Sequence, residues 1–481
     1  MNEIFGAING FLSNVLFFDI LFGQVEGTKI PFLVAWLIAG GIYLTFKMSF
    51  VNLKMLKHSF HIVAGKYHTK DDKGLITPFQ SLTTALSATV GLGNIAGVAI
   101  AISIGGPGAT FWMIIAGFLG MTLKFTEVTL SLQHREFLKD GTIMGGGMEY
   151  LSKGLANKGM PKFGKVLAIT FAIFMVGGAI GGGNTFQVSQ ALSAIATEVP
   201  ILQTYPIIFG ITLAVVTGAV IIGGIKRIAH TTEKIVPLMV LIYISASLWI
   251  LITNFSSIPH AFGLIFSQAF APTAVAGGMI GVIVQGFQRA VFSSEAGLGS
   301  AAIAHAPAKV KYPVRQGMVS LYEPFIDTII VCTMTALVIV ITGVYDPANG
   351  YKELIDAQQG AALTAAAYGT VISWFPIILS ISITLFAFST MISWSYYGER
   401  AWVYLFGSKY SLVFKLIFLA FIVMASVVST SIMVDFSFML ILAMALPNIL
   451  GLYILSGDVK KELDSYLIKL KSGELDREAI K

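Results

Sequence analysis

Residues 77–104 read TPFQSLTTALSATVGLGNIAGVAIAISI, a run of 28 residues without a charged side chain. A helix needs about 20 apolar residues to cross a bilayer, so this run is long enough. The sequence Val90-Gly91-Leu92-Gly93-Asn94 lies near its middle, where two glycines and an amide disfavour a continuous helix. The segment therefore predicts a membrane-spanning helix that is broken about halfway across.

The same pattern occurs a second time, inside another apolar run. Gly91–Ala96 and Gly297–Ala302 share Gly-Leu-Gly-(Asn/Ser)-x-Ala and lie 206 residues apart. Similar glycine-interrupted segments in the two halves of a transporter indicate an inverted repeat whose broken helices face a cavity. The positive N-terminal ends of half-helices suit a carboxylate, and their carbonyl ends suit a small cation. Close packing of helices at small residues is the alternative explanation.

The rest of the chain is apolar as well. Of the 481 residues, 56% are hydrophobic and 12% are charged, whereas a typical soluble domain has about 25% charged residues; the mean hydropathy is +0.80. The apolar runs are continuous rather than alternating, which indicates helices and not the strands of a membrane barrel. We predict an all-α integral membrane protein with about 11 spans, at roughly 30–50, 77–104, 109–132, 165–196, 206–223, 234–253, 274–302, 317–343, 370–396, 411–430 and 434–456.

The basic residues predict the orientation of these spans. Of the 31 Lys and Arg residues, 27 lie in alternate connections or in the C-terminal tail, whereas only Lys29 and Lys352 lie in the other connections. Cytoplasmic loops carry such an excess, so we expect the N-terminus outside and the C-terminus in the cytoplasm. The net charge of +6 then reflects topology and requires no nucleic-acid partner. We expect no cleaved signal peptide, because the N-terminus has no basic region. Residues 4–22 favour a surface helix, and a twelfth span is the alternative.

Polar side chains inside the spans are candidates for a solute site. Asn184, Gln187 and Gln190 recur at three-residue spacing, which favours a wet cavity or, alternatively, hydrogen bonds between helices. Three residues with hydroxyl side chains precede Trp394, namely Ser389, Thr390 and Ser393. Hydroxyl oxygens are ligands that an alkali cation prefers. Hydrogen bonding of these hydroxyls to the helix's own carbonyls is the alternative.

Charged residues also fall within or beside the spans, in three pairs: Lys124 with Glu127, Glu323 with Asp327, and Arg289 with Glu295. The first two pairs are candidates for a gate or a coupling network, and structural ion pairing is the alternative for Lys124 and Glu127. The third pair flanks the second break, where an internal network that holds the broken helix is favoured over solute contact.

Motifs of enzyme chemistry are missing from the sequence. The seven histidines and the single cysteine, Cys332, form no HExxH or CxxC spacing, and there is no Walker-type loop. We therefore expect a protein that is not an enzyme, that holds no cofactor and that does not hydrolyse ATP.

Three motifs, in order, resemble the sodium/alanine–glycine symporter family of the amino acid–polyamine–organocation superfamily. They are Thr89–Gly97 (TVGLGNIAG), Gly105–Met113 (GGPGATFWM) and Arg289–Ala306 (RAVFSSEAGLGSAAIAHA), and the likeness extends over roughly 25–455. Val90–Asn94 is also similar to the VGLGN of the neurotransmitter:sodium symporters. The resemblance implies the leucine-transporter fold, a 5 + 5 inverted repeat with broken core helices 1 and 6 and, here, one extra N-terminal helix.

The resemblance implies a division of the chain into five segments. They are an extracellular N-terminal segment with a surface helix (1–29), the extra transmembrane helix with a cytoplasmic loop (30–76), the first repeat (77–253), the second repeat (274–456) and a cytoplasmic tail (457–481).

The resemblance also implies site residues. Those expected to bind substrate are Thr89, Gly91, Gly93, Asn94, Gln187, Phe292, Ser293, Ser294 and Trp394. Those expected to bind sodium are Thr89, Val90, Asn94, Ser389 and Thr390. Many members have Asn at the position of Ser294 and Pro at that of Ala302, which leaves the substrate open.

The resemblance implies a sodium-coupled symporter of the plasma membrane that imports alanine, glycine or a similar small neutral amino acid by alternating access. Sodium is the expected coupling ion, and the sequence does not determine an oligomeric state. A carrier of glutamine or another polar amino acid, or coupling to protons, is the alternative within the class. A channel is less favoured, because it requires a continuous polar pore.

Overall fold

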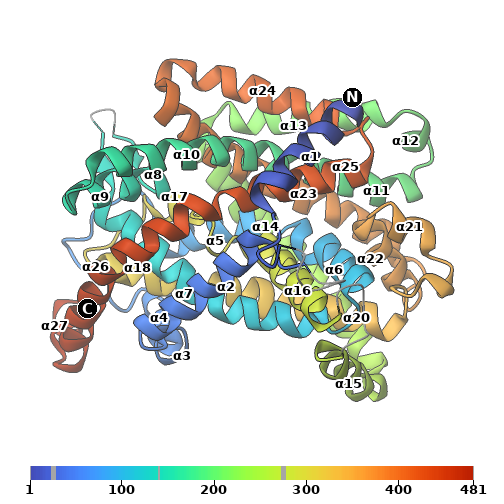
Figure 1. Cartoon of the computed structure of the whole chain (residues 1–481), viewed down its shortest axis with the longest axis horizontal. Helices are drawn as coiled ribbons and strands as arrows, with labels where there is room; N and C mark the ends of the chain where they lie inside the picture. The colour runs from blue at the N-terminus through green and yellow to red at the C-terminus, as the bar shows by residue number, and fades with distance from the viewer. Residues whose placement is uncertain (1, 23–28, 139–140, 272–277, 480–481) are drawn as a thin grey trace.

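The computed structural model describes residues 2–22, 29–138, 141–271 and 278–479. Its helices run mostly along the long axis of the molecule, and many lie nearly parallel or antiparallel to one another (Figure 1). A short antiparallel hairpin joins β1 (Glu136–Phe137) to β2 (Ile143–Met144). Parts of the predicted segments 1–29 and 274–456 lie outside the described residues.

Seven helical segments among the described residues are long and apolar enough to cross a membrane. The helices α5 and η1–α6, bent by 50° at a short break, form one more span if they are counted together. Two further predicted spans coincide with the shorter apolar helices α2 (Phe32–Lys47) and α13 (Pro206–Ile221), and the predicted span 274–302 contains the 17-residue helix α16 (Gly278–Ser294). The all-α membrane class is therefore confirmed, and the count of about 11 spans stays a prediction.

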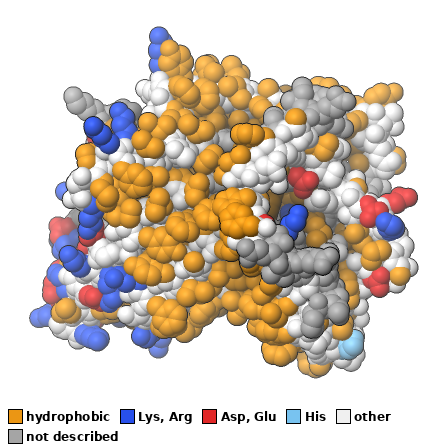
Figure 2. Space-filling view, in the orientation of Figure 1, with side chains coloured by type: hydrophobic (Ala, Val, Ile, Leu, Met, Phe, Trp, Pro, Cys, Tyr) orange, Lys and Arg blue, Asp and Glu red, His pale blue; other side chains and the backbone are white. Residues whose placement is uncertain are grey.

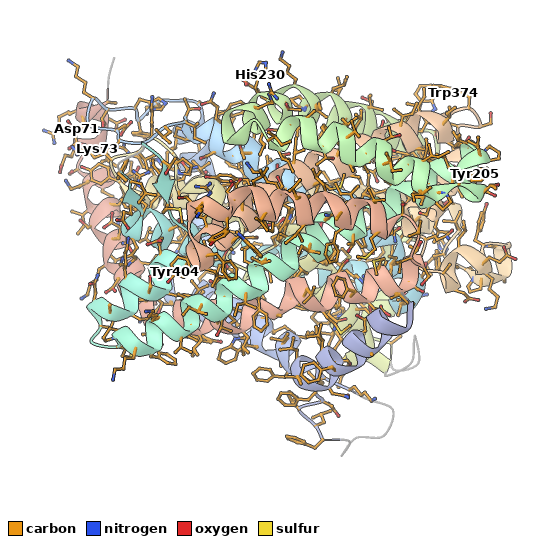
Figure 3. All side chains as sticks on the ribbon, turned by 90° about the horizontal axis from the view of Figure 1, so that it is seen from above. Asp71, Lys73, Tyr205, His230, Trp374 and Tyr404 are labelled. Atoms are coloured by element: carbon orange, nitrogen blue, oxygen red, sulfur yellow. The ribbon has the colours of Figure 1, made fainter. Side chains whose placement is uncertain are left out.

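The surface divides into an apolar band and two polar ends. Hydrophobic side chains form a broad band across the visible face, and Lys and Arg gather at one end of the long axis (Figure 2). This basic end carries α4 (Leu56–Val63), α9 (Leu155–Asn157), α18 (Pro313–Val319) and α27 (Glu474–Glu478). Asp71 and Lys73 lie there, whereas Tyr205 and Trp374 lie at the opposite end (Figure 3).

The first break separates α5 (Pro78–Thr89) from the π-helix η1 (Gly93–Gly97), which continues into α6 (Val98–Gly105). Helix α5 starts with a capping box, in which the Thr77 side chain accepts from the Gln80 N–H. The helix ends at Val90, whose ψ of 85° leaves the helical region. The predicted break is therefore present at the Val-Gly-Leu-Gly-Asn sequence.

The second break separates α16 from α17 (Ala301–His305). Gly297 and Gly299 have φ of +86° and +76°, which glycine adopts without steric cost. Glu295 has φ of +57°, which is uncommon for a residue with a side chain. Its carboxylate accepts hydrogen bonds from Ser300 Oγ and, at 2.9 Å, from Trp394 Nε1. These contacts hold the strained residue in place.

The other helices surround the broken pair. The long helix α7 (Ala109–His134) packs against α16 and α18, and α23 (Phe375–Phe406) packs against α5, α10 and α11. The chain between α7 and α16 forms α8 (Gly147–Glu149), η2 (Tyr150–Gly154), α10 (Pro161–Ile180), η3 (Gly181–Thr185), α11 (Phe186–Glu198), α12 (Ile201–Thr204), α14 (Gly224–Thr253), η4 (Phe255–Ser257) and α15 (Ile258–Ala269).

The remaining elements are α1 (Asn2–Leu16), α3 (Val51–Lys54), α19 (Tyr322–Pro324), η5 (Phe325–Cys332), α20 (Thr333–Thr342), η6 (Pro347–Asn349), α21 (Lys352–Asp356), α22 (Gly360–Gly369), η7 (Ser408–Tyr410), α24 (Ser411–Ala425), α25 (Thr430–Ala443) and α26 (Ala445–Lys471). Helix α1 lies along α25, where Asn9 donates to the Ile432 carbonyl at 3.3 Å.

Candidate functional site

Asn94 forms hydrogen bonds within the first break and to the π-helix η5. Its Oδ1 accepts a hydrogen bond from the Gly91 N–H at 2.9 Å, which replaces an acceptor that the interrupted helix does not provide. Its amide nitrogen donates to the carboxylate of Asp327 at 2.7 Å and to the backbone carbonyl of the same residue at 3.0 Å. Both side chains are buried.

The second break reaches the same carboxylate. Ser293 Oγ donates to Asp327 Oδ2 at 2.8 Å, and Thr328 Oγ1 donates to the same oxygen at 2.9 Å. The two breaks also touch directly, because a Cβ added to Gly93 would lie 2.9 Å from the Cα of Ser293. Asp327 therefore joins both broken helices through hydrogen bonds.

The Asp327 carboxylate is surrounded by neutral donors. None of the ion pairs in the described part of the chain includes it. A buried carboxylate at membrane depth is costly without a counter-charge and marks a functional site. Carboxylate, amide and hydroxyl oxygens are the hard ligands that a small cation prefers. The arrangement of Asn94, Ser293 and Asp327 can therefore hold such a cation between the two breaks.

Gln187 and Thr390 enclose the first break from two other helices. A Cβ on Gly91 would collide with Thr390 Oγ1 and would lie 3.7 Å from Gln187 Oε1. The Leu92 N–H donates to Gln187 Oε1 at 3.4 Å, while Gln187 Nε2 donates to the Gly182 carbonyl at 2.8 Å. Four predicted residues, Gly91, Asn94, Gln187 and Thr390, thus lie around one turn of backbone.

The predicted amide face of α11 is divided in the structure. Asn184 donates to the Phe418 carbonyl at 2.7 Å, and Gln190 donates to the Gln358 carbonyl at 2.9 Å. Asn184 lies in the π-helix η3, whose wider turn changes the three-residue spacing. Only Gln187 of the three contacts the first break.

Aromatic rings form one wall of the same region. Phe292 lies edge-on to Phe186, with ring centres 4.7 Å apart, and 5.9 Å from the ring of Phe438. Trp394 packs on Gly183, and its indole N–H is bound to Glu295, so the ring is fixed in the interior. These bulky side chains form a packed wall beside η3 and the second break.

The hydroxyl-bearing residues Ser389, Thr390 and Ser393 of α23 contact α5. Ser87 Oγ lies 3.0 Å from Ser393 Oγ and donates to the Ser389 carbonyl at 3.2 Å. Thr390 Oγ1 donates to the Ser87 carbonyl at 3.3 Å, and Ser389 Oγ donates to Phe386 of its own helix at 3.0 Å. The structure therefore brings Ser389 and Thr390 to the helix that carries Val90, as the predicted sodium position requires. Sodium binding there stays a prediction.

Two predicted residues make only local hydrogen bonds. Thr89 Oγ1 donates to the Ala85 carbonyl at 3.2 Å and Ser294 Oγ donates to the Ala290 carbonyl at 2.9 Å, each within its own helix. Both are buried, and neither side chain is shown to contact Asp327.

A second polar cluster lies between α7, α17, α18–α19 and α26. Lys124 Nζ pairs with Glu323 at 3.0 Å, and His305 Nε2 lies 2.5 Å from the other oxygen of that carboxylate. Glu127 accepts from Asn448 Nδ2 at 2.7 Å, and the same nitrogen donates to the Gly297 carbonyl at 2.8 Å within the second break. The predicted pairs Lys124–Glu127 and Glu323–Asp327 are thus divided among different partners, because the fold joins residues far apart in sequence.

Arg135 joins the chain ends of the two broken helices at the basic end. It donates to the carbonyls of Ala306 and Ala308 at 2.8 and 2.7 Å and to that of Lys73 at 2.9 Å. Burial lowers the pKa of its guanidinium to about 10, which leaves it charged at neutral pH. Bridges of backbone hydrogen bonds pair Lys73 with Val310 and Ile76 with Ala308. The segment before α5 and the segment after α17 are therefore connected directly.

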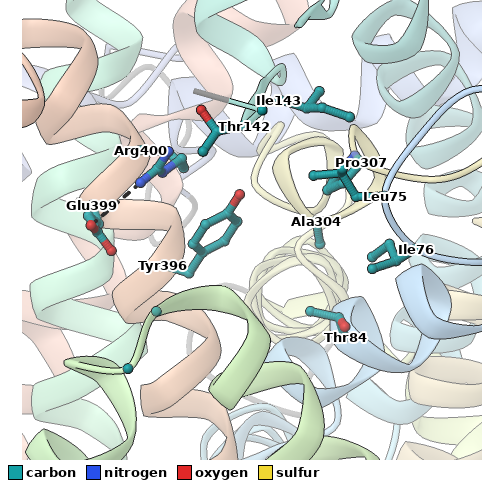
Figure 4. A pocket seen from close by; sticks show the side chains of 13 residues that line it. Leu75, Ile76, Thr84, Thr142, Ile143, Ala304, Pro307, Tyr396, Glu399 and Arg400 are labelled. Carbon is teal, nitrogen blue, oxygen red and sulfur yellow. Dashed lines mark hydrogen bonds and ion pairs between the residues drawn. The ribbon is translucent and has the colours of Figure 1, made fainter. Parts of the chain in front are cut away.

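A cavity of about 740 Å³ lies between the broken pair and the basic end. We call it the vestibule; it is lined by Leu75, Ile76, Thr84, Gly141, Thr142, Ile143, Gly223, Gly224, Ala304, Pro307, Tyr396, Glu399 and Arg400 (Figure 4). Thr84 and Tyr396 each lie three residues from a partner of the Ser87–Ser393 contact. One turn of helix thus separates the vestibule from that contact.

The opposite end is closed more tightly. Gln190 bridges to the start of α22 and to the residues before it, accepting from the Ala361 N–H at 3.1 Å and donating to the Gln358 carbonyl. The Arg289 guanidinium lies 4.8 Å from the ring centre of Phe438. A separate cavity of about 280 Å³ lies near the surface between α11, α12 and α25. The larger of these two cavities therefore lies toward the basic end.

Sequence comparison identifies the type of protein that this chain resembles. The model of the "Sodium:alanine symporter family" matches residues 17–480. The chain is 41% identical over 437 residues to the sodium/alanine symporter AgcS of Methanococcus maripaludis, covering 91% of this chain and 94% of that protein. It is 33% identical to the probable sodium/glutamine symporter GlnT of Bacillus subtilis, covering 92% of this chain and 89% of that protein.

Structural comparison supports the fold. The crystal structure of MhsT in complex with L-phenylalanine superposes with a TM-score of 0.56 at 14% sequence identity. The match covers 80% of this chain and 89% of that chain. The chain therefore shares the fold of a transporter of the leucine-transporter type.

Proposed function

Because the chain belongs to the sodium:alanine symporter family, we propose that it imports alanine, glycine or a similar small neutral amino acid together with sodium. The observation that carries this proposal is the buried Asp327 carboxylate, which binds Asn94 of the first break and Ser293 of the second. A cation bound there neutralises the carboxylate and joins the two helices that are expected to hold the substrate.

Sodium occupies two candidate positions in this proposal. One is formed by Asn94, Ser293 and Asp327, with Thr89 at the end of α5 beside it. The other is formed by the Val90 carbonyl with Ser389 and Thr390. Both offer oxygen ligands from a broken helix and from a neighbouring helix, so sodium binding stabilises one arrangement of these elements.

The amino acid binds beside the first break. The positive N-terminal end of the half-helix that starts at Gly93 suits its carboxylate, and Gln187 supplies a polar side chain. Phe292 and Trp394 limit the space for the substrate's side chain, which favours alanine and glycine. Glutamine is the second candidate, because a family relative is named a probable sodium/glutamine symporter and Ser294 leaves more room than Asn.

The basic end faces the cytoplasm in this proposal, with the N-terminus outside. The segments 77–253 and 274–456 are the two inverted repeats, and their relative motion exposes the site to each side in turn. The vestibule at the basic end then corresponds to the form from which substrate leaves to the cytoplasm.

The test is uptake of labelled alanine, glycine and glutamine into proteoliposomes, with an inward sodium gradient or with potassium in its place. Accumulation of alanine or glycine only with sodium is the expected result. Accumulation of glutamine instead moves the substrate assignment to the second candidate. Uptake driven by an imposed proton gradient, and not by sodium, overturns the choice of coupling ion.

A further inference from the structure

The vestibule contains a basic side chain whose hydrogen-bonding capacity is largely unused. Arg400 lies on α23, one helical turn beyond Tyr396, and its side chain is 17% exposed. Its NH2 lies 3.5 Å from Glu399 Oε1, and its NH1 lies 4.0 Å from Met144 Sδ. Its Nε is buried and has no hydrogen-bond partner in the described part of the chain. A guanidinium offers five N–H groups, so most of them remain free.

The local charge balance is positive. Glu399 is the acidic residue that lines the vestibule, and Lys415 Nζ lies 3.4 Å from the same oxygen that Arg400 faces. Ser411 Oγ also donates to that oxygen. Since two cations share one carboxylate, the cluster carries an excess positive charge inside the protein. An anionic ligand group is the complement that this excess favours.

The vestibule walls differ in polarity. Arg400, Tyr396 and Thr142 lie along one side, and Tyr396 directs its hydroxyl toward the interior of the cavity (Figure 4). Leu75, Ile76, Ala304 and Pro307 lie on the other side. A small amphiphile with a carboxylate and an apolar side chain fits this division. A guanidinium binds a carboxylate through two parallel hydrogen bonds.

We propose that the vestibule is a second, exit-side binding site for the transported amino acid, in which Arg400 binds the carboxylate. This inference rests on the proposed function, because the ligand is the substrate that leaves the breaks. The site lies on the route from the Ser87–Ser393 contact to the basic end. Amino acid bound there slows the return of the empty carrier when its concentration inside is high.

The test measures occupation of the vestibule without sodium, so that the sodium-dependent site at the breaks contributes little. Leu75→Cys provides the probe, because Leu75 lines the vestibule and is 52% exposed. The native Cys332 is buried and gives low background. The purified full-length protein is labelled with a maleimide in potassium buffer, with L-alanine, alaninamide or chloride added at equal millimolar concentrations.

The expected result is that L-alanine slows labelling, whereas alaninamide, which has no carboxylate, and chloride do not. Arg400→Gln in the Leu75→Cys background raises the alanine concentration needed for half-protection about tenfold or more. Arg400→Lys, which keeps the charge, gives an intermediate value. Arg477→Gln is the matched control, because Arg477 bonds only to backbone carbonyls of the exposed tail, and it leaves protection unchanged.

Equal protection by alanine and alaninamide overturns this inference, and so does equal protection by chloride or unchanged protection in Arg400→Gln. Sodium-driven uptake by the same preparations is measured in parallel. Uptake without vestibule protection refutes the exit-side site alone, whereas absence of sodium-driven uptake refutes the proposed function. Loss of monodisperse elution in gel filtration identifies a variant that has not folded. If Arg400→Gln is such a variant, the protection measured in Arg400→Lys decides.

Discussion

Asp327 shows how far single residues could be interpreted from the sequence. The amide of Asn94 in an apolar run predicts the helix break, whereas the resemblance predicts both Asn94 and Ser293 as site residues. The acidic group in an apolar span marked Asp327 as functional, but its partners lie 233 and 34 residues away. Local spacing does not contain such contacts, so only the fold placed this carboxylate between the two breaks.

We expect Asp327→Asn to raise the sodium concentration needed for half-maximal uptake about tenfold or more, because the amide removes the negative charge that attracts the cation. Uptake is measured in proteoliposomes over a range of external sodium. Asp356→Asn is the control, since Asp356 forms an exposed ion pair with Lys352 on α21. An unchanged sodium dependence in Asp327→Asn contradicts the proposed ion position.

Helices and their breaks were predictable to a different extent. The repeated Gly-Leu-Gly pattern located both breaks within a few residues, because glycine and an amide disfavour continuous helix wherever they occur. The sequence did not predict the π-helical turns η1, η2, η3 and η5. It also did not predict that Lys124 pairs with Glu323 instead of Glu127. Ion pairs between elements depend on which helix faces lie together, and periodicity within one helix does not determine this.

Lys124→Met is expected to lower the stability of the protein by about 3–5 kcal/mol, because it leaves the buried Glu323 carboxylate without its cation. Thermal unfolding in detergent measures the effect. The double variant Lys124→Met/Glu323→Gln loses less than the two single variants together, since no unpaired charge remains. Lys352→Met, at an exposed pair, serves as control and changes stability by about 0.5 kcal/mol or less. Additive losses in the double variant refute the pairing argument.

The connection between α4 and the tail helix α26 predicts a pH effect. His58 Nε2 lies 2.9 Å from Tyr466 Oη. Burial, together with the charges of His61 and Arg315, lowers the pKa of His58 to about 4. The unfolded chain takes up a proton near pH 6.5, and the folded chain does not, so unfolding becomes more favourable as the pH falls through this range.

His58→Gln should therefore lose less thermal stability between pH 7 and pH 5 than the unaltered protein does. The measurement is the unfolding temperature at both pH values. His230→Gln, at an exposed position on α14, is expected to keep the full acid loss. If His58→Gln and the unaltered protein lose the same amount, His58 does not carry the effect.

At the scale of the whole molecule, composition and charge predicted the membrane class, and the resemblance predicted the family and the leucine-transporter type of fold that the comparisons confirm. The inverted repeat and the count of spans stay predictions. The alternation of basic and neutral connections along the chain also predicted the concentration of Lys and Arg at one end of the molecule. The vestibule was not predictable, because its lining comes from segments dispersed over more than 300 residues. Packing between distant helices determines which of them enclose space.

Cysteine labelling tests the proposed orientation. Asp71 and Tyr205 lie at opposite ends of the molecule (Figure 3). Tyr205→Cys is expected to react with a membrane-impermeant maleimide on intact cells, and Asp71→Cys only after permeabilisation, if the basic end faces the cytoplasm as proposed. The buried Cys332 makes the unaltered protein the control. The reverse pattern contradicts the orientation.

The contacts between the segment before α5 and the segment after α17 have a mechanical consequence. Arg135 and the backbone bridges fasten the chain before α5 to the chain after α17, and Asp327 fastens the same two helices at their breaks. Two helices that are connected at two separate points cannot rotate independently of each other. The broken helices then move as one rigid unit, and a ligand that stops the motion of either helix stops the motion of both.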